Sequence, residues 1–222
     1  MLQYMKPKLY KVVEIFKSID GEGKKAGLVT TFIRLYGCNL RCSYCDTLYG
    51  IEGNNYIEMT LEDIVDECNK NGTPNITLTG GEPLIHDDVY FLVYILTLKG
   101  FYVNIETNGA VDISPYLSNP KIIITLDYKC PSSNMEHKML RSNFAKIRPC
   151  DVVKFVVGSK EDLDKAKQII DLYSLHNAYL SPVYGKIEPK QIVDYMIEHN
   201  MTDTKIQLQL HKFIWEPDKR GV

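Results

Sequence analysis

The chain has 222 residues, 45% of them hydrophobic, and its 26 Lys and Arg against 28 Asp and Glu give a formal net charge of −2. This length and apolar content suffice for one sizeable core, and no linker-like stretch divides the sequence, so residues 1–222 are predicted to form one domain. A nearly balanced charge supplies no positive field for a nucleic-acid backbone, which argues against direct binding of nucleic acid.

The N-terminal stretch MLQYMKPKLYKVVEIF alternates apolar with polar residues and lacks the continuous apolar region of a signal peptide, which predicts a cytoplasmic protein. The longest apolar run, VYFLVYILTL at 89–98, is about half the length that crosses a bilayer, so a buried helix is predicted and no membrane span. In a reducing compartment, the six cysteines are predicted to be thiols or metal ligands and not disulfides.

Short β-branched or apolar runs alternate with helical patterns along the chain. Strands are predicted at 30–35, 75–78, 101–105, 121–126, 152–157, 178–180 and 205–210. Helices are predicted between them at 60–72, at 88–99, from residue 159 onward and after Pro189, with capping-box spacing at Thr60 with Asp63 and at Ser159 with Asp162. This alternation predicts an α/β fold with a parallel sheet, arranged as a complete or partial (β/α) barrel.

The unusual residues cluster directly after the predicted strands. The segments are GCNLRCSYCDT, TGGEP, ETNG, DYK, SPV and HK. Because the carboxyl ends of parallel strands share one face of a barrel, these segments are predicted to form one composite pocket. The irregular polar segment 129–151 is a long loop, and loops of that length are more often functional than idle.

Three cysteines, Cys38, Cys42 and Cys45, have the spacing C-x3-C-x2-C. A structural zinc site is normally closed by four ligands, whereas an iron–sulfur cluster with three protein thiolates leaves one iron open for chemistry. Cys68 falls on the apolar face of a predicted helix and is expected to be a packing residue. The spacing alone leaves zinc and an iron–sulfur cluster as alternatives.

This cysteine motif, placed after a strand and a glycine and followed by GGEP, resembles the radical S-adenosylmethionine superfamily. The resemblance implies that Cys38, Cys42 and Cys45 hold a [4Fe-4S] cluster and that the fourth iron binds S-adenosylmethionine. An electron from an external one-electron reductant, such as a flavodoxin, then releases a 5′-deoxyadenosyl radical. The residues implied to contact the cofactor are Tyr44, Cys45, Asp46, Gly80, Gly81, Glu82, Glu106, Thr107, Asn108, Asp127, Tyr128, Lys129, Ser181, Pro182 and Val183.

Three longer segments, SIDGEGKKAGLVTTFIRLYGCNL, TLDYKCPSSNMEHKML and IQLQLHKFIWEPDKRGV, resemble the 7-carboxy-7-deazaguanine synthase family over residues 14–222. This resemblance implies a partial (β/α) barrel and a homodimeric lyase of queuosine and deazapurine biosynthesis. The implied reaction converts 6-carboxy-5,6,7,8-tetrahydropterin to 7-carboxy-7-deazaguanine with loss of ammonia. Thr47 is implied to bind Mg²⁺, and the implied substrate residues are Ile19, Asp20, Gly21, Glu22, Arg34, Thr79, His211 and Val222.

Several of these residues also have simpler interpretations. Arg34 supplies a planar fork for a carboxylate, but its place inside a strand also permits a structural role. Glu22 accepts from ring N–H groups, or is a solvated turn residue. Asp20 stands where the family often has glutamine, and a carboxylate accepts but cannot donate. Thr47 read alone is a loop or cap residue, and His211 either packs or faces the pocket.

Two other functions share some of these features. An activating enzyme for a glycyl-radical protein has the same cluster motif, but would need a protein-docking surface. A non-catalytic zinc or electron-transfer module would need only the cysteines. The C-terminal KFIWEPDKRGV is too polar to continue the last strand, and is predicted to fold back over the pocket.

Overall fold

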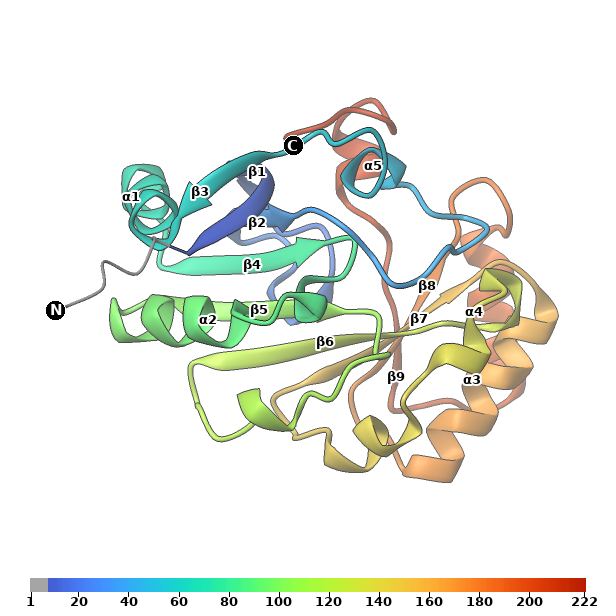
Figure 1. The fold of residues 1–222 in the computed structure, drawn as a ribbon. Helices are drawn as coiled ribbons and strands as arrows, with labels where there is room; N and C mark the ends of the chain where they lie inside the picture. Colours follow the sequence, from blue (N-terminus) through green and yellow to red (C-terminus); the bar gives the residue numbers. More distant parts are fainter. Residues whose placement is uncertain (1–7) are drawn as a thin grey trace, which may run out of the picture.

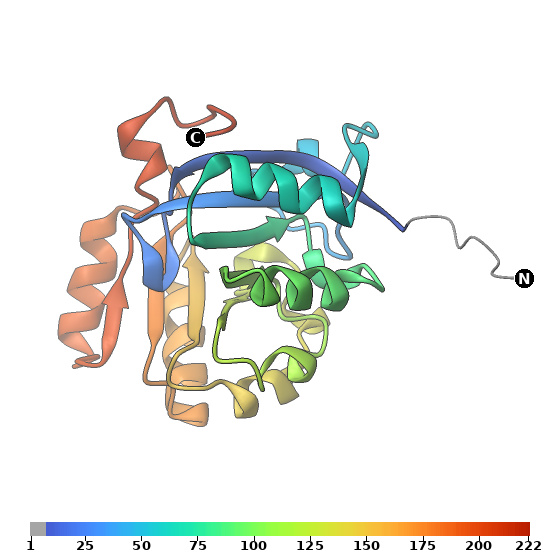
Figure 2. The same ribbon diagram turned by 90° about the vertical axis from the view of Figure 1, so that its left-hand side faces the viewer.

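The computed structural model describes residues 8–222, in which one curved sheet carries helices on its outer face (Figures 1 and 2). The strands are β1 Leu9–Ile19, β2 Val29–Leu35, β3 Ile57–Thr60, β4 Asn75–Gly80, β5 Tyr102–Thr107, β6 Ile122–Tyr128, β7 Val152–Val157, β8 Ala178–Pro182 and β9 Thr204–Ile206. Their order is β3-β1-β2-β4-β5-β6-β7-β8-β9. From β2 to β9 neighbouring strands are parallel, and β1 is antiparallel to both β2 and β3.

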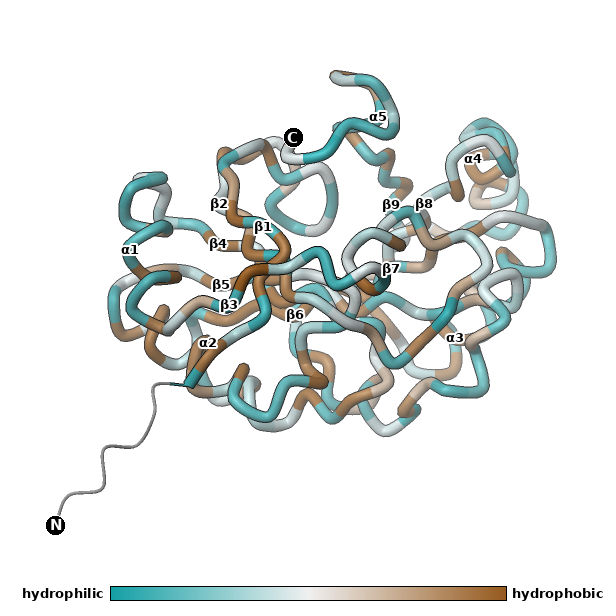
Figure 3. The backbone as a smooth tube through the Cα atoms, turned by 45° about the horizontal axis from the view of Figure 1, so that its top comes forward, coloured by the Kyte–Doolittle hydropathy of each residue, from teal (hydrophilic) through white to brown (hydrophobic). Residues whose placement is uncertain are grey.

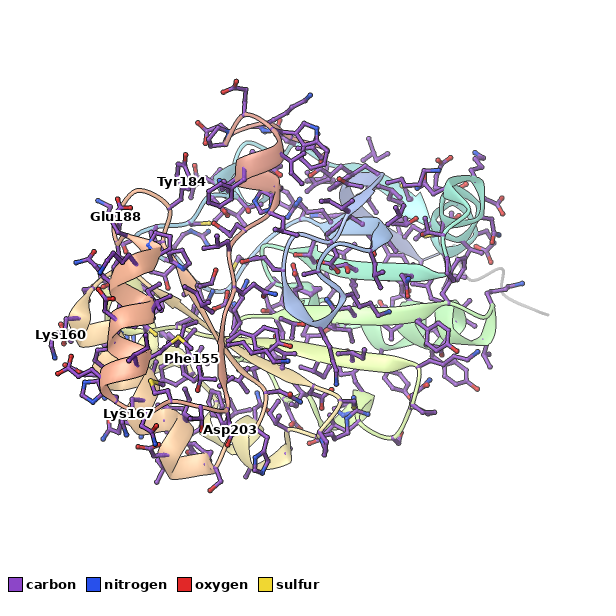
Figure 4. The ribbon with its side chains drawn as sticks, turned by 180° about the vertical axis from the view of Figure 1, so that it is seen from behind. Phe155, Lys160, Lys167, Tyr184, Glu188 and Asp203 are labelled. Carbon is purple, nitrogen blue, oxygen red and sulfur yellow. The ribbon has the colours of Figure 1, made fainter. Side chains whose placement is uncertain are left out.

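The α-helices are α1 Leu61–Asn71, α2 Val89–Leu98, α3 Lys160–Tyr173, α4 Pro189–Glu198 and α5 His211–Ile214. Short 3-10 turns are η1 Gly23–Lys25, η2 Leu48–Gly50, η3 Pro83–Ile85, η4 Ser114–Tyr116, η5 Pro131–Ser133, η6 Glu136–Lys138 and η7 Arg141–Lys146. The side chains labelled in Figure 4 show the layering, because Phe155 lies in the interior while Lys160 and Lys167 point outward from α3.

The sheet does not close, since β3 and β9 are its two edges within residues 8–222. The prediction of a partial (β/α) barrel is therefore confirmed. The strands β1 and β3 were not predicted. The alternation in the N-terminal segment is the period-2 pattern of β1, in which Tyr10 and Val12 are buried while Leu9 and Lys11 are exposed.

Local signals determine where the first predicted helix begins and ends. The Thr60 hydroxyl accepts from the Asp63 N–H, and the Asp63 side chain accepts from the Thr60 N–H, so the capping box is present. Gly72 ends α1 in the left-handed region with φ of 67°, where a side chain would be strained.

The second capping box is only half formed. Ser159 accepts from the Asp162 N–H at 3.2 Å. The Asp162 carboxylate instead accepts from the N–H groups of Ser132 at 2.9 Å and Gly158 at 2.7 Å. It therefore holds segment 129–151 against α3 and does not return to the cap.

The apolar helix α2 is only half buried, which corrects the prediction of a buried helix. Val89, Leu92, Val93 and Leu96 face the sheet and are buried. The other face is exposed because a sheet covers one side of a helix, and it carries Tyr90, Phe91, Tyr94 and Leu98. Within residues 8–222 no helix has the length and apolar character to cross a membrane.

The last strand is shorter than predicted, since β9 ends at Ile206 and not near residue 210. The Gln207 N–H still donates to the Leu180 carbonyl at 2.8 Å. Its side chain, however, bonds both the N–H and the carbonyl of Gly23, at 2.6 and 2.9 Å. The chain is thereby tied to η1 and leaves the sheet, which brings His211 to the start of α5 and not to the end of a strand.

Hydrophobic residues concentrate in the middle of the sheet, whereas the segment after β9 is mostly hydrophilic (Figure 3). Central positions such as Leu78, Ile105, Ile124 and Phe155 have no exposed surface. A rigid, well-packed sheet of this kind fixes where the strand ends lie, and the site described next is built on those ends.

Candidate active site

A cavity of about 680 Å³ opens at the carboxyl ends of the parallel strands, within the size range of small-molecule sites. Most of the residues predicted for the site line it. They are Ile19, Asp20, Gly21, Glu22, Arg34, Cys38, Cys42, Tyr44, Cys45, Asp46, Thr47, Thr79, Gly80, Gly81, Glu106, Thr107, Asn108, Asp127, Lys129, Val183, His211 and Val222. The single composite pocket predicted from the strand ends is therefore present.

The three thiols lie on the loop that follows β2. Cys38 Sγ accepts from the Leu40 N–H at 3.4 Å and from Asn108 Nδ2 at 3.7 Å, which ties the loop to the end of β5. Burial raises the pKa of Cys38 and of Cys42, and the Lys129 ammonium opposes that rise at both. A cation beside the loop favours thiolate, the form that binds metal.

Two glycines let the end of β4 approach this loop closely. A Cβ on Gly81 would lie 2.3 Å from the Gly37 carbonyl oxygen and 2.7 Å from Cys38 Cβ. A Cβ on Gly80 would lie 2.3 Å from the Leu35 carbonyl oxygen. The Gly-Gly pair is therefore required by backbone contact with the cysteine loop.

Glu82 lies in the protein interior and connects the joint between β4 and the cysteine loop to the end of β5. Its carboxylate accepts from the Leu84 N–H at 3.0 Å, the Thr107 hydroxyl at 2.9 Å and the Asn108 N–H at 2.6 Å. Burial raises its pKa to about 7, although these hydrogen bonds oppose the rise.

Four predicted site residues do not line the cavity: Glu82, Tyr128, Ser181 and Pro182. Each makes its contacts in the protein interior instead. The Tyr128 hydroxyl donates to Glu136 at 2.7 Å, and Tyr128 packs on Phe155. Ser181 is buried in β8 and donates to Glu22 at 3.3 Å, and Pro182 is the last, buried residue of that strand.

The irregular segment 129–151 supports the cysteine loop from outside. The Ser43 N–H donates to the Ser133 carbonyl at 3.2 Å, and the Ser43 hydroxyl donates to the Ser132 carbonyl. Burial raises the pKa of Cys130 well above its ordinary value, and the half-buried Cys150 lies beside Asp151. Neither of these cysteines lines the cavity.

The donor set fits an iron–sulfur cluster better than a single metal ion. Among residues 8–222, no three Cys, His, Asp or Glu side chains are placed to hold one metal ion. A cubane cluster differs in its requirement, because each thiolate binds its own iron. Beside the thiols, Asp127 Oδ2 accepts from the Lys129 ammonium at 2.9 Å, while its Oδ1 is buried without a hydrogen-bond partner among residues 8–222. An orphaned carboxylate oxygen in a cavity is an acceptor for a bound ligand.

A group of carboxylates forms another part of the lining. Asp20 accepts from the Thr77 hydroxyl at 2.9 Å, and burial together with the nearby Glu106 raises its pKa to about 7. Burial also raises the pKa of Glu106. Glu22 makes an ion pair with Lys154, whose Nζ lies 2.9 Å from Oε2.

Arg34 is held across the antiparallel strands. Its Nε donates to Glu14 Oε1 at 2.7 Å, and its guanidinium carbon is 5.8 Å from the centre of the Tyr49 ring. Part of its fork is thus used structurally, as one interpretation of the sequence anticipated. Because Arg34 also lines the cavity, the two interpretations are compatible.

The segment after β9 completes the mouth of the cavity, and residues 217–222 line it. The Arg220 guanidinium lies 3.8 Å from the centre of the Tyr49 ring. Lys212 donates to the Pro217 carbonyl at 2.9 Å and lies 5.8 Å from the ring centre of Tyr184, which is labelled in Figure 4. The C-terminal segment therefore folds over the pocket.

Thr47 and Asp46 lie together at this mouth. The Thr47 hydroxyl donates to Asp46 Oδ1 at 2.8 Å. Lys212 Nζ is 4.0 Å from Asp46, whose side chain is partly exposed, and these contacts lower the pKa of the carboxyl. His211 faces Gly21 so closely that a Cβ there would lie 2.6 Å from Nδ1. Burial lowers the pKa of His211 and favours the neutral imidazole.

Two lining residues that carry charge or aromatic surface were not predicted, Lys154 and Tyr49. Lys154 interrupts the apolar run VVKFVV of β7. A lysine inside a buried parallel strand is unusual enough to have been a signal. Tyr49 lies in the short turn η2, and nothing in its local sequence points to the cavity.

The fold and the cysteine loop define a radical S-adenosylmethionine enzyme. Residues 32–127 match the family model for the Radical SAM superfamily. The crystal structure of SuiB from Streptococcus suis, bound to a precursor peptide, shares the fold with a TM-score of 0.58 over 77% of this chain and 46% of that chain, at 14% identity.

Relatives that match nearly the whole chain identify the family within this class of enzymes. A 7-carboxy-7-deazaguanine synthase from Clostridium acetobutylicum is 47% identical over 96% of this chain and 99% of the relative. One from Methanospirillum hungatei is 39% identical over 93% of this chain and 86% of the relative. The crystal structure of QueE from Escherichia coli has a TM-score of 0.73 over 90% of this chain and 94% of that chain, at 23% identity. The chain belongs to the 7-carboxy-7-deazaguanine synthase family.

Proposed function

We propose that this protein converts 6-carboxy-5,6,7,8-tetrahydropterin to 7-carboxy-7-deazaguanine with loss of ammonia, in queuosine or deazapurine biosynthesis. One observation carries the proposal beyond family membership. A single cavity is lined both by three thiols and by a set of charged side chains that suit a polar heterocycle. A zinc module would need the first feature only.

Cys38, Cys42 and Cys45 would hold a [4Fe-4S] cluster, and the strand-end residues beside them would hold S-adenosylmethionine. When bound and reduced, this pair supplies the radical that takes a hydrogen from the substrate. The protein's own part is to bind and orient. Gly80 and Gly81 present backbone beside the thiols, and the unpartnered oxygen of Asp127 accepts from a ligand. The chain end that covers the mouth excludes water.

The carboxylates would recognise the pterin. Glu22 accepts from N–H groups on the guanidine-like edge of the ring, and the terminal nitrogens of Arg34 donate to the substrate carboxylate. Asp20 stands where the family often has glutamine. With its pKa raised to about 7, a fraction of Asp20 is protonated at neutral pH and donates as an amide would.

Mg²⁺ would bind between Thr47 and the substrate carboxylate. Hydroxyl and carboxylate oxygens suit this hard cation, and Thr47 already pairs with Asp46 at the cavity mouth. We expect Mg²⁺ to stimulate turnover and Thr47→Ala to weaken that response more than it weakens cleavage of S-adenosylmethionine. An unchanged rate after chelation would show that Thr47 has another role.

The remaining features of the proposal concern the setting of the enzyme. We propose that residues 1–222 form one domain and that the protein is a cytoplasmic homodimer. It takes electrons from an external donor such as a flavodoxin and binds no nucleic acid. Sedimentation analysis at micromolar concentration measures the oligomeric state directly.

The reaction itself is tested by anaerobic reconstitution with iron and sulfide. The holoenzyme is incubated with S-adenosylmethionine, a reductant and the carboxypterin, and products are identified by mass. We expect 7-carboxy-7-deazaguanine and ammonia in equal amounts, and none from Cys42→Ala. A colourless, zinc-loaded protein, or 5′-deoxyadenosine without any deazapurine, would contradict the proposal.

A further inference from the structure

Lys154 occupies an unusual position for a lysine. It lies within the interior strand β7, where it is buried, and its register partner on β6 is Asp127. Its Nζ is 2.9 Å from Glu22 Oε2 and 3.8 Å from Asp127 Oδ2. One ammonium therefore contacts a carboxylate from the β1–β2 connection and another from β6.

Burial alone disfavours the charged form of a lysine, but the carboxylates around Lys154 favour it. Burial lowers the pKa of Lys154, and the carboxylates of Glu22, Asp127 and Glu106 more than offset that effect, so the pKa lies above its ordinary value. Removing such a cation leaves buried carboxylates uncompensated, which costs far more than a surface ion pair.

In each of the two carboxylates that Lys154 contacts, one oxygen faces the lysine and the other is available to a ligand. Glu22 uses Oε2 for Lys154, while its Oε1 accepts only a longer bond of 3.3 Å from Ser181. Asp127 places Oδ2 between Lys129 and Lys154, while Oδ1 is buried without a hydrogen-bond partner in the part of the chain that the structure describes. In both cases Lys154 fixes one oxygen and thereby sets the direction of the other.

We propose that Lys154 is a positioning residue that orients Glu22 toward the pterin and Asp127 toward S-adenosylmethionine, and so couples the two binding sites. This inference rests on the proposed function, since it assumes that both ligands share the cavity. Lys154 acts through the carboxylates and need not contact the reacting atoms.

The charge around Lys154 gives the proposal a pH signature. The ionisable groups that face it from the surrounding elements are Glu22, Asp46, Glu106, Asp127, Lys129 and His211. Lys154 lowers the pKa of Glu106, so its loss raises that pKa further. Without the lysine, Glu106 takes up a proton at higher pH, and ligand affinity falls earlier as the pH drops.

The test measures binding, not only turnover. Dissociation constants of the cluster-loaded protein for the carboxypterin and for S-adenosylmethionine are determined anaerobically by equilibrium dialysis between about pH 8 and pH 6. For Lys154→Met we expect the pterin constant to rise at least about tenfold and that of S-adenosylmethionine about threefold, with both losses growing toward acid. Lys205→Met is the matched control, because Lys205 is exposed on the edge strand β9.

A double-mutant cycle shows whether Lys154 acts through Glu22. Adding Lys154→Met to Glu22→Gln should cost little further pterin affinity, whereas the loss of S-adenosylmethionine affinity should persist. Constants within about twofold of the native protein, a loss independent of pH, or fully additive pterin losses would each overturn the proposal.

Two further measurements distinguish failure of this proposal from misfolding of the variant and from failure of the proposed function. If Lys154→Met does not fold, Lys154→Gln lacks the charge but still donates to Glu22, and it should show the same loss toward acid. A native protein that binds no carboxypterin would contradict the proposed function. The role of Lys154 would then be decided by the affinity for S-adenosylmethionine alone.

Discussion

The two kinds of cysteine in this chain differ in what surrounds the sulfur. Cys42 lines the cavity, where Lys129 partly offsets the effect of burial on its pKa. Cys68 has no exposed surface on α1, and burial raises its pKa to about 12. The first is suited to bind metal as a thiolate, and the second is an apolar filler.

Substituting these cysteines should separate the two roles. We expect Cys42→Ala to abolish activity and reduce bound iron, measured by iron content and visible absorption after reconstitution. Cys68→Ala should keep most activity and lose about 1 kcal/mol of stability, because only one sulfur atom leaves a packed site. A fully active Cys42→Ala protein with an intact cluster would remove the assignment of the loop.

Glu82 makes stability depend on pH in an unusual direction. Its carboxyl has an ordinary pKa of 4.5 and a folded pKa of about 7, so the folded state binds more protons between those values. The free energy of unfolding should therefore rise as the pH falls from about 8 toward 7. Below about 6.5, the lowered pKa values of His86 and His211 act in the opposite direction and reduce this rise.

Urea unfolding at several pH values measures this effect. Asp20 and Glu106, whose pKa values are also raised, contribute with the same sign as Glu82. Glu82→Gln removes one of the three groups, so the rise in stability from about pH 8 to pH 7 should be smaller in that variant. An identical slope in both proteins would mean that Glu82 stays ionised when folded.

At the scale of elements, the joint between β4 and the cysteine loop tolerates no side chain. We expect Gly81→Ala to displace the loop, because its Cβ would lie 2.3 Å from the Gly37 carbonyl oxygen. Bound iron should fall severalfold while the helical circular dichroism remains. Gly158→Ala is the control, since its Cβ would make ordinary contacts at 3.4 Å. Equal iron content in the two variants would contradict this account.

Elements with local signals could be predicted, and those defined by distant partners could not. Thr60, Asp63 and Gly72 set the ends of α1 from within the sequence of that helix. The buried position of Lys154 depends on Glu22, which is 132 residues away. In the same way, β9 is shortened by the contact of Gln207 with η1, which no pattern within 205–210 contains. Hydrophobic periodicity and capping or turn residues can be recognised within a short stretch of sequence. Burial and strand pairing depend on residues far away in the chain.

The candidate site was more predictable than the edges of the sheet. Parallel strands put their carboxyl ends on one face by geometry, so segments far apart in the sequence had to meet. The direction of a side chain decides whether the residue lines that face or makes supporting contacts in the interior. Glu82 and Ser181 both point inward to polar partners, which the sequence alone does not show.

At the scale of the whole molecule, the C-terminal segment should couple radical formation to product formation. Deleting residues 218–222 removes the contact of Arg220 with Tyr49 and opens the mouth of the cavity. We expect weaker pterin binding and a higher ratio of released 5′-deoxyadenosine to deazapurine product, because water and other hydrogen donors gain access. Unchanged coupling and affinity would show that the segment has no part in closing the site.

The order of strands also bears on how the protein is made. From β5 to β9 each strand pairs with the one synthesised just before it, so this part of the sheet can grow as the chain leaves the ribosome. The contacts of the cysteine loop with β4 and β5 can form once Asn108 has emerged, whereas segment 129–151, Lys154, His211 and the covering segment follow later. Iron and sulfide can thus be delivered before the mouth is covered. A chain lacking residues 218–222 should acquire iron at least as fast as the full chain.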